Sequence, residues 1–107
     1  QHKTHEVFCV LFLNNQHELL ACEEMFRGSL SQAQVYPREV ATRALQLGAQ
    51  ALIVAHNHPS GSAAVSQADL QITTQLKQAL ALIDVRLLDH IIIAGVATHS
   101  MAEHGQI

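Results

Sequence analysis

Two histidines, a serine and an aspartate lie close together near the middle of this 107-residue chain. His56 and His58 are two residues apart at the end of the apolar run 51–55, and residues two apart on a strand point to the same face. A Pro-Ser-Gly turn signal separates them from Ser66 and Asp69. Zinc enzymes use three protein ligands of these types and leave a fourth position for water. The spacing therefore predicts a hydrolytic zinc site held by His56, His58 and Asp69.

Ser66 and Asp69 have a second interpretation, because Ser-x-x-Asp ahead of an apolar helix is also typical of a helix N-terminus. Serine is a preferred N-cap residue, and an aspartate in the first turn lies where the helix dipole favours negative charge. A low carboxylate pKa at that place would keep Asp69 anionic at neutral pH. The two interpretations do not exclude each other, since a capping aspartate can also be a metal ligand.

The stretch AHNHPSG, followed by Ser-x-x-Asp and later by LLDHIII, resembles the RadC branch of the JAMM (JAB/MPN) metalloprotease fold. The resemblance extends over nearly the whole chain and implies that His56, His58 and Asp69 bind Zn²⁺. It also implies a single α/β domain in which helices flank a mixed β-sheet, the JAB/MPN (cytidine-deaminase-like) architecture. RadC-like sequences commonly carry proline just before the motif serine, and this chain has Val65 there. We expect that difference to loosen the loop without removing a ligand.

The same resemblance implies a zinc-dependent metallohydrolase that cleaves an amide bond, in a peptide or an isopeptide, with a metal-activated water. Glu6 would serve as the general base and then as the general acid, and Ser66 would donate a hydrogen bond to the oxyanion. The residues alone leave a second candidate for the base. A short hairpin turn would place Glu23 opposite Phe8, on the face that carries Glu6. The resemblance favours Glu6.

An apolar run over 7–13 and a second segment over 18–26, joined by a polar turn, predict a β-hairpin whose first strand is buried on both faces. The expected register places Cys9 opposite Cys22, close enough for their sulfurs to touch. No signal peptide is evident, which favours a cytoplasmic setting where thiols stay reduced. We therefore expect two buried thiols and no disulfide.

The rest of the chain alternates helical and strand patterns. Pro37 suits the first position of a helix, and Gly48 suits the stop after it. The segment 29–36 has no regular pattern, and we expect an irregular or short-strand connection there. The remaining periodic segments are helices over 38–47 and 67–83 and strands over 51–55, 85–94 and 97–101. This order predicts an α/β domain with a mixed β-sheet.

Two polar pairs lie inside these segments. Glu39 and Arg43 are four residues apart on the first helix, and we expect a surface ion pair of small energetic value between them. Asp89 and His90 precede the apolar triplet Ile-Ile-Ile, and a hydrogen-bonded structural pair is the favoured interpretation. The alternative, which the resemblance supports, is a role for His90 beside the metal.

Size and composition agree with one folded domain over residues 1–107, with a core at about 5–101 and a loosely held tail at 102–107. The hydrophobic share of 49% and charged share of 14% are typical of globular proteins. No apolar run approaches the roughly 20 residues of a membrane span. The chain opens with glutamine rather than methionine, so we expect it to be an excised domain.

Charge bears on the choice between three functions. The formal net charge is −3, and the six lysines and arginines are scattered along the chain. A stripe of basic residues that would release counterions from a phosphate backbone is not visible. This pattern disfavours the DNA-repair module that the RadC name suggests. A metal-free interaction domain is disfavoured because the full ligand set is present. The sequence favours a zinc peptidase or isopeptidase with a peptide or protein substrate.

Overall fold

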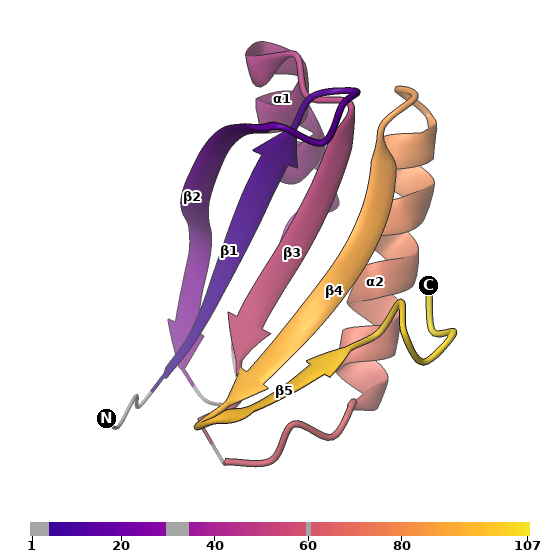
Figure 1. The fold of residues 1–107 in the computed structure, drawn as a ribbon. Coiled ribbons are helices and arrows are strands. Elements are labelled where there is room, and N and C mark those ends of the chain that lie inside the picture. Colours follow the sequence, from indigo (N-terminus) through magenta and orange to yellow (C-terminus); the bar gives the residue numbers. More distant parts are fainter. Residues whose placement is uncertain (1–4, 30–34, 60) are drawn as a thin grey trace.

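A computed structural model describes residues 5–29, 35–59 and 61–107 of the chain. Most of the connection predicted as irregular at 29–36 lies outside these ranges. The described elements, in chain order, are β1 (His5–Leu13), β2 (Leu19–Ser29), α1 (Pro37–Leu47), β3 (Ala51–Asn57), α2 (Gln67–Ala81), β4 (Arg86–Ala94) and β5 (Ala97–Ser100). They form one sheet in the order β2-β1-β3-β4-β5, with both helices packed on the same face (Figure 1). The predicted α/β fold with a mixed sheet is confirmed.

The sheet is mixed because one of its strand pairs is parallel. β1 is antiparallel to both β2 and β3, β3 and β4 run parallel, and β5 returns antiparallel to β4. A parallel pair needs a crossover connection, and α2 supplies it. The chain therefore leaves the carboxyl end of β3 in the middle of the sheet and enters α2 through a short loop.

The β1–β2 register differs from the sequence prediction. Cys9 lies opposite Glu24, and Cys22 lies opposite Leu11, so the prediction that the two cysteines face each other is wrong. The strands shift past each other at a bulge after Phe8 and at a second irregularity near the turn. Cys22 is also exposed, which contradicts the expectation of two buried thiols.

Burial alternates along β1. The side chains of Phe8, Val10 and Phe12 are buried beneath the helices, while those between them are only half-buried. The prediction of a strand buried on both faces is therefore wrong, because the helices cover a single face (Figure 1).

The core lies between that face and the two helices. α1 contributes Val40 and Ala44, and α2 contributes Leu76 and Leu80, all of them fully buried. α1 begins at Pro37 and ends before Gly48, which takes the left-handed backbone conformation with φ of 68°. The sheet side of the core consists of Phe8, Val10, Phe12, Leu52, Val54 and Leu87. Both helices thus form for the reason predicted, which is apolar packing on the sheet.

The last residues of the chain are held in place. Met101 is fully buried, and its carbonyl accepts a hydrogen bond from the Gln106 N–H at 2.8 Å. Gln106 Oε1 lies within hydrogen-bond distance of His99 Nε2, at 2.8 Å. The prediction of a loosely held tail is wrong for this reason. Among the described residues, no helix has the length and apolar character that crossing a membrane requires.

Candidate metal centre

The end of β3 carries both histidines to the helix-covered face of the sheet. His56 follows the buried Leu52 and Val54 in the alternating pattern of the strand and is itself buried. His58 lies one residue past the end of β3, and its N–H donates to the Ile93 carbonyl of β4 at 2.7 Å. That bond prolongs the strand geometry, so the two imidazole rings lie only 4.7 Å apart between centroids.

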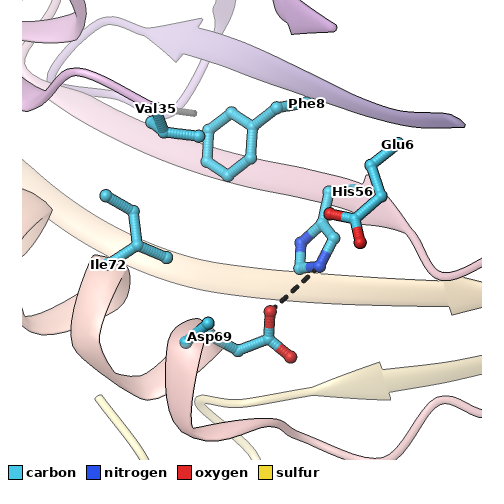
Figure 2. Close-up of a pocket in the computed structure, with 7 residues that line it drawn as sticks. Glu6, Phe8, Val35, His56, Asp69 and Ile72 are labelled. Atoms are coloured by element: carbon cyan, nitrogen blue, oxygen red, sulfur yellow. Dashed lines mark ion pairs between the residues drawn. The ribbon is translucent and has the colours of Figure 1, made fainter. Parts of the chain in front are cut away.

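The first turn of α2 brings the carboxylate to them. Ser66 is the N-cap, its Oγ accepts from the Asp69 N–H at 3.1 Å, and the Ser66 N–H donates to Asp69 Oδ2 at 2.9 Å. This reciprocal capping box fixes the Asp69 side chain. Asp69 Oδ1 lies 3.1 Å from His56 Nε2, and Asp69 Oδ2 lies 3.2 Å from His58 Nε2. Figure 2 shows the contact between His56 and Asp69.

The three side chains suit a metal ion. Their ligand atoms lie within 4.8 Å of one another. Two ligands bound to zinc at about 2.0–2.2 Å in a tetrahedron are about 3.3–3.6 Å apart, and the His56–Asp69 and His58–Asp69 contacts of 3.1 and 3.2 Å are close to that range. The donor set of two imidazoles and one carboxylate is one that zinc accepts. His56, His58 and Asp69 can therefore hold a metal ion together.

Hydrogen bonding of His58 supports the same conclusion. Its Nδ1 lies 2.9 Å from the Ser62 carbonyl oxygen, which can only accept, so Nδ1 carries the proton. The other ring nitrogen, Nε2, is therefore the one directed at Asp69 Oδ2, at 3.2 Å, and the one available to a metal ion.

Electrostatics keep the carboxylate charged. Burial alone would raise the pKa of Asp69, but hydrogen bonds from His56 and from the Ser66 backbone outweigh it and hold the pKa well below its usual range. Asp69 is therefore an anion at neutral pH, as the sequence predicts from its place at the start of α2.

His90 extends the cluster into the core. Its Nε2 lies 2.8 Å from His56 Nδ1, and its Nδ1 lies 2.6 Å from the Thr73 hydroxyl. Burial lowers the pKa of His90 to about 4, so the ring is neutral at pH 7. Asp89 accepts from the His90 main-chain N–H at 2.7 Å, yet its carboxylate binds Ser100 on the other side of the strand. The Asp89 carboxylate thus bonds only the main chain of His90, while the His90 imidazole contacts His56.

Thr73 is the neighbour that the sequence analysis missed. It lies four residues after Asp69 on the same helix face, and its hydroxyl donates to the Asp69 carbonyl at 2.7 Å. That spacing was visible in the sequence. Its relation to His90 was not, because the two residues are 17 positions apart and meet only after α2 packs on β4.

A cleft of about 160 Å³ opens beside His56 and Asp69. Its polar end is formed by Glu6, His56 and Asp69, and Figure 2 shows the Glu6 carboxylate beside the His56 ring. The β1–β3 register explains this position, because Phe8 pairs with His56 and Glu6 lies two residues before Phe8 on the same face. The rest of the wall consists of Phe8, Val35, Ala68 and Ile72.

Glu23 is not at this cleft. It lies opposite Val10 rather than Phe8, four strand positions beyond Glu6, which corresponds to about 13 Å along the strand. Two hydrogen bonds of 2.7 and 2.8 Å join its carboxylate to Arg43 of α1. The predicted Glu39–Arg43 pair is wrong for the same reason, because the guanidinium is directed at Glu23 across the helix–sheet interface.

The capping interpretation of Ser66 is confirmed by its hydrogen bonds. The side chain is exposed and is not part of the described wall of the cleft. Its action on an oxyanion stays a prediction.

Comparison with known proteins agrees with this geometry. The family described as RadC-like JAB domain matches residues 1–106. A UPF0758 protein of Methylibium petroleiphilum is 62% identical over 103 residues, which are 96% of this chain and 46% of that protein. A UPF0758 protein of Cupriavidus pinatubonensis is 59% identical over 102 residues, covering 95% and 45%, and one of Thiobacillus denitrificans is 55% identical over 105 residues, covering 98% and 47%.

The chain spans a little less than half the length of these relatives. The match nevertheless includes almost every residue of the chain, His56, His58 and Asp69 among them. The chain belongs to the RadC-like JAB domain family.

Proposed function

We propose that this domain is a zinc-dependent hydrolase that cleaves an amide bond in a peptide or an isopeptide. The observation that carries the proposal is the approach of His56 Nε2 and His58 Nε2 to the two oxygens of Asp69, at 3.1 and 3.2 Å. Membership of the JAB family, whose members are typically hydrolytic, supports the same reaction class.

Each residue of the site has a separate task in this proposal. His56, His58 and Asp69 would hold the zinc ion. When bound, zinc supplies an acidified water and polarises the scissile carbonyl. Glu6 would accept the proton of the attacking water and deliver it to the leaving amine, because its carboxylate lines the cleft that ends at His56. Ser66 Oγ accepts from the Asp69 N–H, and its own O–H proton would donate to the oxyanion.

Metal content tests the proposal most directly. We expect about one zinc per chain in protein purified without chelator, and loss of zinc in His58→Ala. His104→Ala is a matched control, since His104 lies on the exposed C-terminal turn and is expected to leave the zinc content unchanged. Peptide and isopeptide substrates would then be screened with the loaded wild type. A wild type that takes up no zinc from excess metal would contradict the proposal.

The DNA-processing alternative receives no support from the charges. Two of the six basic side chains, Arg27 and Arg43, form ion pairs with Glu24 and Glu23. The positive charge that could neutralise a phosphate backbone is therefore smaller than the residue count suggests. Binding to duplex DNA that weakens steeply with salt would support a DNA-processing function instead.

A further inference from the structure

We infer that Asn57 is a positioning residue that holds Glu6 at the cleft through a hydrogen bond to the main chain of β1. The inference rests on the proposed function, because Glu6 is the general base of that proposal. It goes beyond the proposal by assigning a task to a residue outside the His56, His58 and Asp69 cluster and outside the described wall of the cleft.

Glu6 lies beyond the point where β1 is paired with the centre of the sheet. The main-chain pairing of β1 with β3 ends at Phe8 and His56. Nearer the start of β1, the strand is still paired with β2, where Glu6 lies opposite Gly28. β2 is the edge strand of the sheet. The segment that carries the proposed base is therefore part of a two-stranded ribbon that extends past the β1–β3 pairing.

A ribbon of this kind tends to turn away from the sheet. Two-stranded ribbons twist more strongly than wider sheets, and a bulge adds twist and bends its strand. The β1–β2 register shifts between Phe8 and Cys9, which is where the ribbon begins. Without a further attachment to β3, we expect the ribbon to twist away and to carry the Glu6 carboxylate from its place beside the His56 ring (Figure 2).

The Asn57 side chain supplies that attachment. Its Oδ1 accepts a hydrogen bond from the Val7 N–H at 2.6 Å. A main-chain N–H can only donate, so the atom in contact with it must be the amide oxygen of Asn57. Val7 is next to Glu6 in the chain. The bond therefore continues the link between β1 and β3 one residue past the end of their main-chain pairing.

The place of Asn57 in β3 separates this task from metal binding. Asn57 stands between His56 and His58 in the chain, and successive side chains of a strand point to opposite faces, so its amide is directed away from the face that carries the imidazole rings. Its main chain is paired with Ile93 of β4, and the His58 N–H donates to the Ile93 carbonyl at 2.7 Å. A change of the Asn57 side chain is therefore expected to leave the metal cluster in place and to act on Glu6.

The test compares Asn57→Leu, which is similar in size and has no acceptor, with Asn57→Asp, which keeps an oxygen at the same place. Zinc content, kcat and KM on a substrate found by screening, and hydrogen exchange of the Val7 N–H are measured for each. We expect Asn57→Leu to retain zinc and to lower kcat by about 10- to 100-fold with KM near the wild-type value, because a displacement of about 1 Å at a reacting group can cost about 10²-fold in rate. Asn57→Asp should recover most of that loss. The Val7 N–H should exchange slowly in the wild type and in Asn57→Asp, and faster in Asn57→Leu.

Two further variants show how Asn57 acts. In a Glu6→Gln background, Asn57→Leu should cause no further loss of rate, since the group that it displaces is already absent. Asn14→Leu is the matched control. Asn14 Oδ1 also accepts from main-chain N–H groups, those of Gln16 and Glu18, both at 2.9 Å, but in the turn at the other end of the β1–β2 hairpin. This variant should keep the zinc content and the kcat of the wild type.

Several results would overturn the inference. An unchanged kcat in folded, zinc-loaded Asn57→Leu would show that Glu6 needs no such support. Equal losses in Asn57→Leu and Asn57→Asp would show that the acceptor has no part in the effect. An undiminished effect of Asn57→Leu in the Glu6→Gln background would show that Asn57 acts through another group.

Hydrogen exchange separates this inference from the proposed function. A Val7 N–H that exchanges freely in the wild type would contradict the bond to Asn57 directly, and this measurement decides even if Asn57→Leu fails to fold. A wild type whose Val7 N–H is protected but which hydrolyses no substrate would count against the proposed function and would still support the link between Asn57 and β1.

Discussion

The two oxygens of the Asp69 carboxylate serve different neighbours, and His58 Nε2 approaches the oxygen that also accepts the Ser66 N–H. One side chain thus caps a helix and completes a cluster that could hold a metal ion. The geometry that satisfies the helix N-terminus is the geometry that aims the carboxylate at the histidines.

The two tasks of the capping box can be separated by substitution. Ser66→Ala is expected to lower the free energy of unfolding of the zinc-free domain by about 1 kcal/mol, because the Asp69 N–H loses its acceptor. Zinc content should stay at the wild-type level. Asp69→Asn should remove zinc, because it takes away the anionic ligand. Denaturant titration and metal analysis of both variants check this. Loss of zinc in a folded Ser66→Ala protein would show that the hydroxyl itself is needed at the metal.

Glu6 and Glu23 make a matched pair for the assignment of the general base. Glu6→Gln is expected to keep zinc and to lower the rate of hydrolysis by about 10²- to 10⁴-fold, because the proton acceptor in the cleft is lost. Glu23→Gln is expected to leave the rate unchanged, since Glu23 binds Arg43 away from the cleft. Single-turnover rates on any substrate found by screening measure both. A larger loss of rate in Glu23→Gln than in Glu6→Gln would assign the role of general base to Glu23 instead.

The Glu23–Arg43 pair should give the fold a small dependence on pH. The hydrogen bond from Arg43 holds the pKa of Glu23 below its ordinary value. A carboxylate with a depressed folded-state pKa stabilises the fold above its unfolded-state pKa of about 4.3, and that stabilisation is lost as pH falls through the folded-state pKa. The Tm difference between wild type and Glu23→Gln should therefore be larger at pH 6 than at pH 3.

The control for that experiment is the same substitution in an Arg43→Gln background. Without the guanidinium the difference should lose its pH dependence. A pH dependence that persists in the double variant would assign it to another group.

The apolar wall of the cleft should favour an apolar side chain next to the scissile bond. On zinc-loaded protein, the hydroxamate of 4-methylpentanoic acid is expected to bind about tenfold more tightly than acetohydroxamate, because its branched chain can be partly buried against Phe8 and Ile72. Ile72→Asp should remove this difference and leave acetohydroxamate binding unchanged. Leu82→Asp, at an exposed position past the end of α2, is the control. Isothermal titration calorimetry measures the affinities. Equal affinities of the two hydroxamates for the wild type would contradict this prediction.

Local signals in the sequence predicted the cluster that the structure brings together. His56 and His58 lie at the end of one strand, and Ser66 and Asp69 lie at the start of one helix, so their geometry depends on a few neighbouring residues. The position of Glu6 could not be derived in this way. It depends on the pairing of β1 with β3, two strands that are far apart in the sequence.

The errors have a common physical origin in long-range packing. The predicted β1–β2 register is wrong because Leu13 pairs with Leu19 and an irregularity between Phe12 and Leu13 shifts the pairing further, so that Cys9 lies opposite Glu24. Turn length alone does not reveal such a shift. Arg43 was assigned to its helical neighbour, yet it contacts a strand residue 20 positions away. His90 reaches His56 across 34 positions. Periodicity predicts which face is buried, but not which polar groups meet there.

The connection between β3 and α2 has one ligand side chain before it and another in the helix that follows it. An ion held between His56 and Asp69 would fasten the two ends of this surface segment together, as a disulfide fastens a loop. None of the described residues in this connection, 58–59 and 61–66, is buried, so the segment adds little packing of its own. A bound ion would therefore stabilise the fold by mass action, by about 2.7 kcal/mol at a free-metal concentration one hundred times the Kd. The fraction of folded domain would then depend on the concentration of free metal ion.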